Sequence, residues 1–244
     1  MATGSGDRIS ALPDDILHLL LSRLPSDEEV RTCVLARRWR HLWKSTRAIR
    51  ITNRPWTAEK LHNFVNHLLL LRGGTPADVC SLKCGHLRGE NYISEHLREH
   101  ISNRIYDQLS MFAELWIRHV LSMCQVRVLK VWIRSYRRLC LAHAPFASQF
   151  VRRLDLTDVY LMLINCTHLP LDLSSSGIEG SGHDFFQNIH LSRIYSPTLR
   201  CLVITKCHFH PEFRTCISAP RVTHLELSPS ALAGLLLLKR CHCW

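Results

Sequence analysis

Cysteine and histidine are the residues of this chain whose types could do chemistry. The 244 residues include 11 Cys and 16 His. Three short groups have spacings that metal ligands could use: Cys80-x-x-x-Cys84, Cys207-His208-x-His210 and Cys241-x-Cys243. None has the paired C-x-x-C spacing of structural zinc sites. We therefore predict no metal site and no cofactor, and we interpret Cys84 and Cys207 as small buried hydrophobes.

Sequence motifs for catalysis are also missing. The chain contains no G-x-S-x-G, no P-loop, no G-x-G-x-x-G and no H-E-x-x-H. Unplaced Cys and His pairs arise by chance when both residue types are this frequent. We therefore predict that the protein is not an enzyme.

The charge balance points instead to binding. Lys and Arg number 31 against 20 Asp and Glu, a formal net charge of +11, which favours acidic or polyanionic partners. Residues 36–50 are especially basic and contain Trp39 and Trp43. Phosphate contacts with base stacking on these rings would make a nucleic-acid site. The two rings, however, have the spacing of helical core residues, so we expect them to be buried and rank nucleic-acid binding below binding of an acidic protein.

Composition places the chain among globular proteins. Hydrophobic residues make up 46% and charged residues 21%, which excludes wholesale disorder. No apolar run approaches the length of a transmembrane helix, so we predict no membrane span. The N-terminal sequence MATGSGDR has no apolar region and predicts no secretory signal. We expect a reducing compartment, the cytoplasm and/or the nucleus, with mostly buried thiols.

Short helices are predicted between Ile9 and about Trp43, and they are the first elements along the chain that could position a site. Pro13 suits a helix start, and Pro25 ends the first helix. Ser26 followed by Glu29 has the pattern of a capping box for a second helix. One apolar stripe runs along the first helix, formed by Ile16, Leu17, Leu20, Leu21 and Leu24. A module of about 40 residues rarely buries enough surface to stand alone, so it needs a partner surface.

Two longer amphipathic helices are predicted further along the chain. The first spans residues 57–71 and is stopped by Gly73 and Gly74, and the second spans residues 112–124. Their expected inward residues are Leu61, Phe64, Val65, Leu68 and Leu71 in the first, and Leu115, Trp116, Val120 and Leu121 in the second.

The remainder of the chain contains an internal repeat. Five copies of an L-x-L element begin at Leu129, Leu154, Leu171, Leu202 and Leu225, with a weaker copy over residues 79–84. Period-two spacing places both apolar side chains of a copy on one face of a short strand. We expect these side chains to be buried, in particular Leu154, Leu156, Leu202, Ile204, Leu225 and Leu227. The mean spacing of about 24 residues is typical of leucine-rich repeats. An apolar residue also precedes four of the five copies by three positions: Val126, Val151, Leu199 and Val222.

Residues 7–43 resemble the F-box of plant F-box/leucine-rich-repeat proteins. The matching elements are Leu12-Pro13-Asp14-Asp15-Ile16-Leu17, Arg23-Leu24-Pro25, Arg31-Thr32-Cys33-Val34-Leu35 and Arg37-Arg38-Trp39-Arg40. The resemblance implies an α+β or α/β repeat fold, with an N-terminal helical F-box followed by a leucine-rich-repeat solenoid. It implies boundaries at 1–7 for a flexible tail, 8–50 for the F-box, 51–75 for a helical connector and 76–244 for the repeat region.

The resemblance also implies a function. An F-box docks on the Skp-type adaptor of an SCF ubiquitin ligase, which brings in cullin and RING subunits, and the repeats recruit a protein substrate. Carried over by position, the adaptor-binding residues are Leu12, Pro13, Ile16, Leu17, Leu20, Leu24, Val30, Val34 and Trp39. The alternatives are a repeat scaffold that binds partners without ubiquitin transfer, or a basic nucleic-acid-binding protein.

The last residues of the chain carry a separate expectation. Solenoids need a terminal repeat with a polar outer face, whereas this sequence closes on apolar residues that include Leu235–Leu238. We therefore expect the repeat region to lack a C-terminal cap and this end to be poorly packed.

Overall fold

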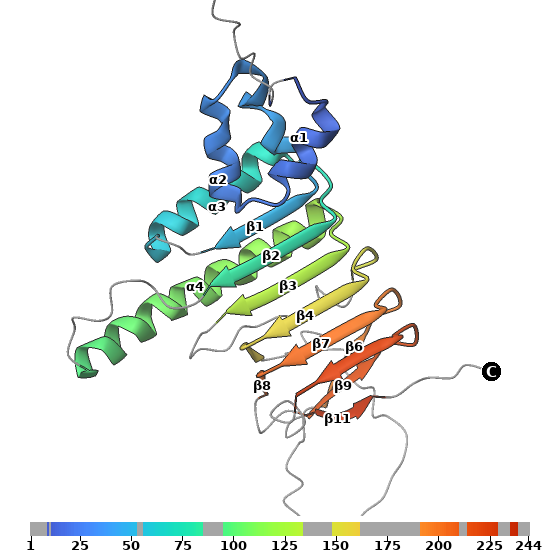
Figure 1. The fold of residues 1–244 in the computed structure, drawn as a ribbon. Helices are drawn as coiled ribbons and strands as arrows, with labels where there is room; N and C mark the ends of the chain where they lie inside the picture. The colour runs from blue at the N-terminus through green and yellow to red at the C-terminus, as the bar shows by residue number, and fades with distance from the viewer. Residues whose placement is uncertain are drawn as a thin grey trace, which may run out of the picture.

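A computed structural model describes residues 9, 11–52, 56–84, 95–133, 148–161, 191–209, 214–228 and 235–238. The described chain begins with a small helical region and continues into an α/β region built on a parallel sheet (Figure 1). This arrangement confirms the expected helical N-terminal region and the expected α/β character of the region after it.

Short helices make up the N-terminal region. They are α1 (Asp14–Leu21), α2 (Ser26–Arg31) and three 3-10 helices, η1 (Thr32–Val34), η2 (Arg37–Arg40) and η3 (Leu42–Ser45). Pro13 precedes α1, and its carbonyl oxygen accepts hydrogen bonds from the backbone N–H groups of Ile16 and Leu17. Asp14 and Asp15 lie in the first turn, where the helix dipole favours negative charge.

The predicted capping box at the start of α2 is wrong. Pro25 is the N-cap residue, and no side chain caps the helix. The Ser26 hydroxyl instead accepts a 3.0 Å hydrogen bond from the backbone N–H of Arg50. Ser26 and Glu29 are both buried against the start of the sheet. Their polar groups are therefore used for contact between elements and not for capping.

Six parallel strands form the main sheet, in the order β1-β2-β3-β4-β7-β10. Their bounds are Ala48–Thr52 (β1), Val79–Cys84 (β2), Val128–Ile133 (β3), Arg153–Thr157 (β4), Cys201–Thr205 (β7) and His224–Leu227 (β10). The repeat copies fall in register across the sheet: Cys80 pairs with Leu129, Leu129 with Leu154, Leu154 with Leu202, and Leu202 with Leu225. Equivalent repeat positions therefore lie side by side in neighbouring strands.

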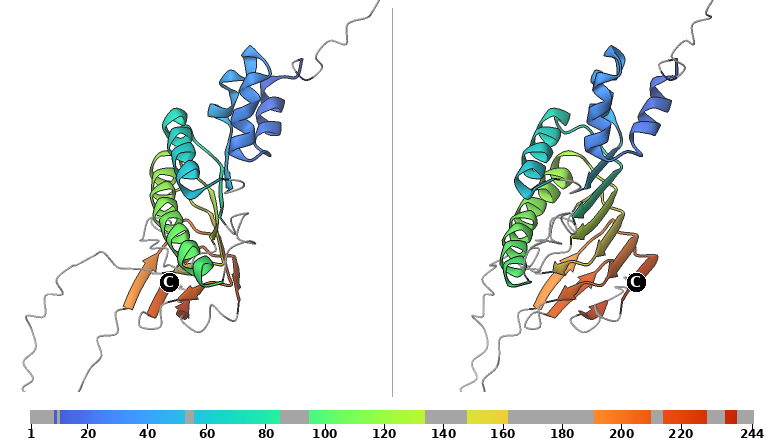
Figure 2. Two further views of the ribbon diagram at one scale, coloured as in Figure 1. Left: turned by 90° about the vertical axis from the view of Figure 1, so that its left-hand side faces the viewer. Right: turned by 60° about the vertical axis from the view of Figure 1, so that its left-hand side comes forward.

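Two helices cover one face of this sheet, α3 (Ala58–Arg72) and α4 (Glu95–Met123) (Figure 2). The Thr57 hydroxyl caps α3 by accepting a hydrogen bond from the backbone N–H of Lys60. Gly73 ends the helix with a φ of 57°, a conformation that glycine adopts without steric cost. The core lies between these helices and the strands.

Most of the predicted inward helix residues are buried, but two are not. Leu61, Val65, Leu68, Trp116, Val120 and Leu121 belong to the core, and Phe64 packs against it. Leu71 and Leu115 are exposed, so both predictions are wrong. The inward face of α3 continues through Leu69 and Arg72 instead, and that of α4 through Ala113 and Ile117.

The repeat positions are buried through most of the sheet. The buried set is Leu129, Val131, Leu154, Leu156, Leu202 and Ile204, together with the preceding residues Val126, Val151 and Leu199. Leu225 and Leu227 were expected to be buried, but Leu225 is 41% exposed and Leu227 is only partly buried, because β10 has a described neighbour on one side only. The copy at Leu171 lies outside the described residues.

A second, smaller set of strands lies near the C-terminal end. β5 (Tyr160–Leu161) pairs with β8 (His208–Phe209), and β9 (Arg214–Ser218) lies between β6 (Leu191–Tyr195) and β11 (Leu235–Leu238). Leu235, Leu237 and Leu238 of β11 pair with Thr215, Cys216 and Ile217 of β9. The poor packing of this end and the absence of a cap stay predictions.

The domain boundaries also stay predictions. Strand β1 crosses the expected boundary at residue 50 and joins the sheet by pairing with β2. Among the described residues, no helix has the length and apolar character needed to cross a bilayer.

Candidate functional site

The helical N-terminal region has a small core of its own. Leu17 and Leu21, one helical turn apart on α1, pack with Trp39 of η2. These three side chains are at most 6% exposed, and Leu12, Leu24, Ala36 and Leu42 pack around them. Asp14 accepts a 2.8 Å hydrogen bond from Nε of Arg38, which fastens η2 to the start of α1. The core therefore fixes the orientation of α1.

A second apolar set on α1 faces solvent. Ile16 is 42% exposed, Leu19 54% and Leu20 48%. Val34 and Leu35, at η1, are more exposed still. We call the first three residues the α1 apolar surface. Nothing in the described chain covers these large apolar side chains, so the surface is a candidate for contact with a partner.

The nine residues predicted to bind an adaptor separate into two groups. Pro13, Ile16, Leu20 and Val34 are exposed, whereas Leu12, Leu17, Leu24, Val30 and Trp39 are wholly or partly buried. Leu17 and Trp39 form the small core, and Val30 packs against the main core. The exposed group is accessible to a partner directly, and the buried group holds it in place. All nine stay predictions as adaptor contacts.

Buried polar residues connect the helical region to the sheet and α3. Arg72 of α3 is 3% exposed. Its guanidinium donates to the carbonyl oxygens of Trp43 and Thr46 and to the Thr46 hydroxyl. Glu29 of α2 is 1% exposed and lies near enough for its charge to act on Arg72. We call Glu29, Trp43, Thr46 and Arg72 the Arg72 junction.

Burial dominates the electrostatics of this junction. Desolvation raises the pKa of Glu29 to about 7, although the Thr46 hydroxyl and the charges of Arg72 and Arg50 oppose this rise. Desolvation likewise lowers the pKa of Arg72, against the opposing charge of Glu29. One carboxyl oxygen of Glu29, Oε1, has no hydrogen-bond partner. The Glu29 carboxyl therefore gains or loses its proton near neutral pH.

Sequence interpretation missed the Arg72 junction. Arg72 lies just beyond the helix predicted over residues 57–71, and no buried contact was predicted for it. A usable signal was present, because Leu61, Val65, Leu68 and Arg72 follow one another at helical spacing on a single face. A charge on the inward face of a helix predicts a buried polar contact.

Some cysteines of the three groups noted in the sequence are buried in the core, and others lie outside the described residues. Cys80 and Cys84 are buried in β2, and burial raises the pKa of each thiol to about 12. Cys207 is also buried and its thiol donates to the Leu156 carbonyl oxygen. These three thiols occupy core positions, as predicted for Cys84 and Cys207. His210, Cys241 and Cys243 lie outside the described residues.

The basic run does not offer its aromatic rings to a ligand. Trp39 is 6% exposed and Trp43 is 5% exposed, which confirms that both are buried. The Trp43 indole N–H donates to the Arg40 carbonyl oxygen. Base stacking on either ring would require the helical region to open.

Comparison with known protein families identifies the helical region. Residues 9–49 match the F-box domain family, and this segment of the chain is an F-box domain. The resemblance predicted from the sequence is thereby confirmed. Proteins with this domain are generally adaptors and not enzymes.

The homologues are F-box proteins of Arabidopsis thaliana. The F-box/LRR-repeat protein At5g02910 is 28% identical over 228 residues, which cover 80% of this chain and 47% of the relative. The putative F-box protein At1g67390 is 26% identical over 234 residues, covering 90% and 45%. The F-box/LRR-repeat protein At3g03360 is 60% identical over 42 residues, covering 17% and 9%. The chain thus spans at most about half the length of these relatives. No solved structure matches it.

Proposed function

We propose that this protein is a substrate-recognition subunit of an SCF-type ubiquitin ligase. Its F-box would dock on a Skp-type adaptor and through it on cullin and RING subunits. The observation that carries the proposal is the α1 apolar surface, which projects from the segment that matches the F-box domain. Apolar anchors exposed on a rigid support are what a protein interface uses.

The sheet region would recruit a protein substrate. We propose that it is a leucine-rich-repeat solenoid. The in-register parallel strands and the buried repeat leucines support this architecture, as do the names of the F-box/LRR-repeat relatives. The adaptor adds no chemistry of its own. It raises the local concentration of the substrate near the conjugating enzyme.

The Arg72 junction supports a coupled arrangement of the two regions. Its hydrogen bonds join η3, the loop before β1 and α3 within a buried site. A substrate held on the sheet would then keep a defined position relative to the adaptor. We further propose that the complex acts in the cytoplasm and/or the nucleus.

Reconstitution with purified ligase subunits tests this function. The chain is mixed with a Skp-type adaptor, a cullin and a RING protein, and the mixture is separated by size-exclusion chromatography. We expect the chain to elute in a complex with all three subunits. When the adaptor is omitted, we expect the chain to elute separately from the cullin and the RING protein. Failure to join the adaptor would favour a repeat scaffold without ubiquitin transfer. Salt-dependent binding of DNA or RNA in place of the adaptor would favour the nucleic-acid alternative.

A further inference from the structure

The main sheet has one covered face and one open face. Side chains alternate along each strand, so Leu82, Val131 and Leu156 point into the core under α3 and α4. The residues between them, including Lys130 and Asp155, point the other way. Figure 2 shows α3 and α4 on one side of the sheet, and no described helix covers β2, β3 and β4 on the other side. We call this second side the open face.

Strand register arranges the open-face side chains in rows. Lys83 of β2 lies beside Trp132 of β3, which lies beside Thr157 of β4. The preceding row contains Ser81, Lys130 and Asp155. A pocket of about 450 Å³ covers both rows and is lined by residues of β2, β3 and β4. The pocket thus combines an aromatic ring, two lysines and hydroxyl groups.

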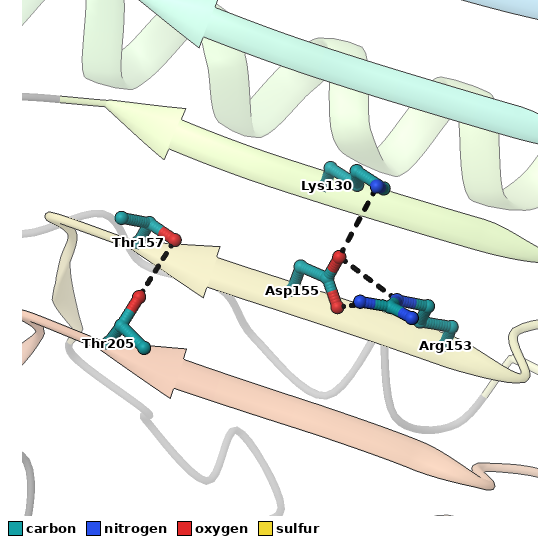
Figure 3. A network of polar contacts seen from close by, with 5 residues as sticks. All are labelled: Lys130, Arg153, Asp155, Thr157 and Thr205. Atoms are coloured by element: carbon teal, nitrogen blue, oxygen red, sulfur yellow. Dashed lines mark hydrogen bonds and ion pairs between the residues drawn. The ribbon is translucent and has the colours of Figure 1, made fainter. Parts of the chain in front are cut away.

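The only acid in the pocket lining is already paired. Asp155 accepts hydrogen bonds of 2.9 and 3.0 Å from Nε of Arg153, one at each carboxyl oxygen. Its carboxylate also lies 3.6 Å from Nζ of Lys130 (Figure 3). One carboxylate thus faces two cations. Glu226 of β10 is another acid on this face. Its negative charge acts on Arg153, which does not line the pocket, whereas Lys130 does.

Lys83 adds a further positive charge to the β2 side of the pocket. Its side chain is exposed, and its ammonium group makes no hydrogen bond or ion pair with the described residues. Lys83 and Lys130 therefore give the pocket an excess of positive charge beside the half-buried indole of Trp132. The Thr157 hydroxyl is hydrogen-bonded to that of Thr205 at 3.0 Å, and Thr157 retains acceptor capacity for a further donor.

We propose that the open face over β2, β3 and β4 binds an extended acidic segment of a partner protein. A partner carboxylate would pair with Lys83 and Lys130, and a neighbouring aromatic side chain would pack on Trp132. The cations that line the pocket are the two lysines Lys83 and Lys130, and Arg153 is not among the lining residues. The pocket therefore lacks the bidentate guanidinium that favours a phosphate group. This inference rests on the proposed function, because the acidic segment would belong to the protein substrate that the sheet region recruits.

Binding of defined peptides to the full chain tests the chemistry. The probes are a fluorescein-labelled nonapeptide of sequence GDWEDWEDG and its amide counterpart GNWQNWQNG, measured by fluorescence anisotropy. We expect the acidic probe to bind at least tenfold more tightly, with affinity falling as salt is raised. Equal binding of the two probes, or no binding of either, would overturn the proposal. Tighter binding of a phosphoserine-containing version than of the acidic probe would overturn the choice of a carboxylate.

Matched variants distinguish peptide binding at the pocket from attraction to the net positive charge of the chain. Lys83→Ser combined with Lys130→Ser should weaken the acidic probe about tenfold, as expected for two partly exposed ion pairs. Trp132→Leu should weaken both probes. Lys60→Ser, on α3 at the covered side of the sheet, should leave the affinity unchanged. An equal loss with Lys60→Ser would show that net charge alone binds the probe and would overturn the proposal.

Adaptor binding by the same variants distinguishes this inference from the proposed function. Lys83→Ser with Lys130→Ser should bind a Skp-type adaptor as the wild type does, because the open face is separate from the α1 apolar surface. A chain that binds the peptide but not the adaptor would contradict the ligase proposal alone. A chain that binds the adaptor but not the peptide would contradict the open-face proposal alone.

Discussion

Arg72 donates a 2.7 Å hydrogen bond from Nη1 to the carbonyl oxygen of Trp43, across the boundary between the α/β region and the F-box. The same guanidinium donates to the Thr46 carbonyl oxygen and hydroxyl. Both backbone acceptors are buried by the surrounding elements. An unpaired backbone carbonyl in such a place is costly, so this one side chain stabilises the contact between the two regions.

Replacing Arg72 should therefore destabilise the whole chain. Arg72→Met keeps most of the apolar stem but leaves the carbonyl oxygens of Trp43 and Thr46 without their donor, and Glu29 without its counter-charge. Each buried carbonyl oxygen left without its donor costs about 1–3 kcal/mol. Urea denaturation followed by tryptophan fluorescence measures the loss. Arg47→Met, at an exposed Arg that pairs with Asp78, is the control and should change stability little. Equal stability of Arg72→Met and wild type would show that the junction is not structural.

Glu29 should make stability depend on pH near neutrality. Its pKa is raised by burial from 4.5 to about 7, so the folded state binds the proton more tightly than the unfolded chain does. The stabilisation is fully present below about pH 4.5 and is lost as pH rises through about 7. A shift of this size corresponds to about 3 kcal/mol.

Denaturation at pH 5.5 and pH 8 measures the effect. Glu29→Gln, which is neutral at both values, should reduce the difference in unfolding free energy between them. Glu28→Gln, at the exposed neighbouring position, should leave the wild-type difference intact. An identical pH dependence in Glu29→Gln and wild type would show that Glu29 does not titrate in this range.

The repeat core supplies a third prediction. Leu202 is fully buried between Leu154 and Leu225 of the neighbouring strands. Leu202→Ala should lower the free energy of unfolding by about 2–5 kcal/mol, the usual result of leaving a cavity in a core. Leu225 occupies the equivalent position of the neighbouring strand but is 41% exposed, so Leu225→Ala should lower the free energy of unfolding by clearly less. Thermal unfolding compares the two variants, and an unchanged melting temperature for Leu202→Ala would mean that the repeat register is wrong.

Strands were easier to predict from this sequence than helix faces. Each L-x-L copy has only two possible orientations, and the same two positions recur from copy to copy, so burial of Leu154 and Leu156 followed from the pattern. In α3, by contrast, Leu68 to Leu71 are four consecutive leucines that cover every side of the helix. Periodicity cannot choose among them, and Leu71 was wrongly placed inside.

Tertiary contacts explain what local patterns could not show. Ser26 and Glu29 matched a local capping rule, but contact with β1 and α3 uses both side chains differently. The contact between Asp155 and Lys130 depends on the register between β3 and β4, which are separated in the sequence. The nine adaptor residues were assigned by resemblance, which does not distinguish the exposed Ile16 from the buried Leu17 of the same helix turn.

The first turn of the F-box gives a fourth prediction. Leu12 packs against the small core, and Pro13 is the N-cap residue of α1. Replacing both by Ala should weaken adaptor binding roughly a thousandfold, if each contributes about 2 kcal/mol. Peptide binding by the open face should persist, because Leu12 and Pro13 belong to the helical region and not to the strands β2, β3 and β4. Surface plasmon resonance with immobilised adaptor measures the loss, and wild-type affinity of the double variant would exclude both residues from the interface.

The central claim is that the α1 apolar surface binds a Skp-type adaptor, and isothermal titration calorimetry with three forms of the full chain tests it most directly. The wild type and Leu70→Asp, a matched change at a 74% exposed leucine on α3, should bind the adaptor with equal affinity. Ile16→Asp combined with Leu20→Asp should weaken binding at least about a hundredfold, since each charge would lie in the apolar contact. Both positions are exposed, so the F-box should stay folded. Equal affinity of the double variant and the wild type, or no heat of binding with the wild type, would contradict the account.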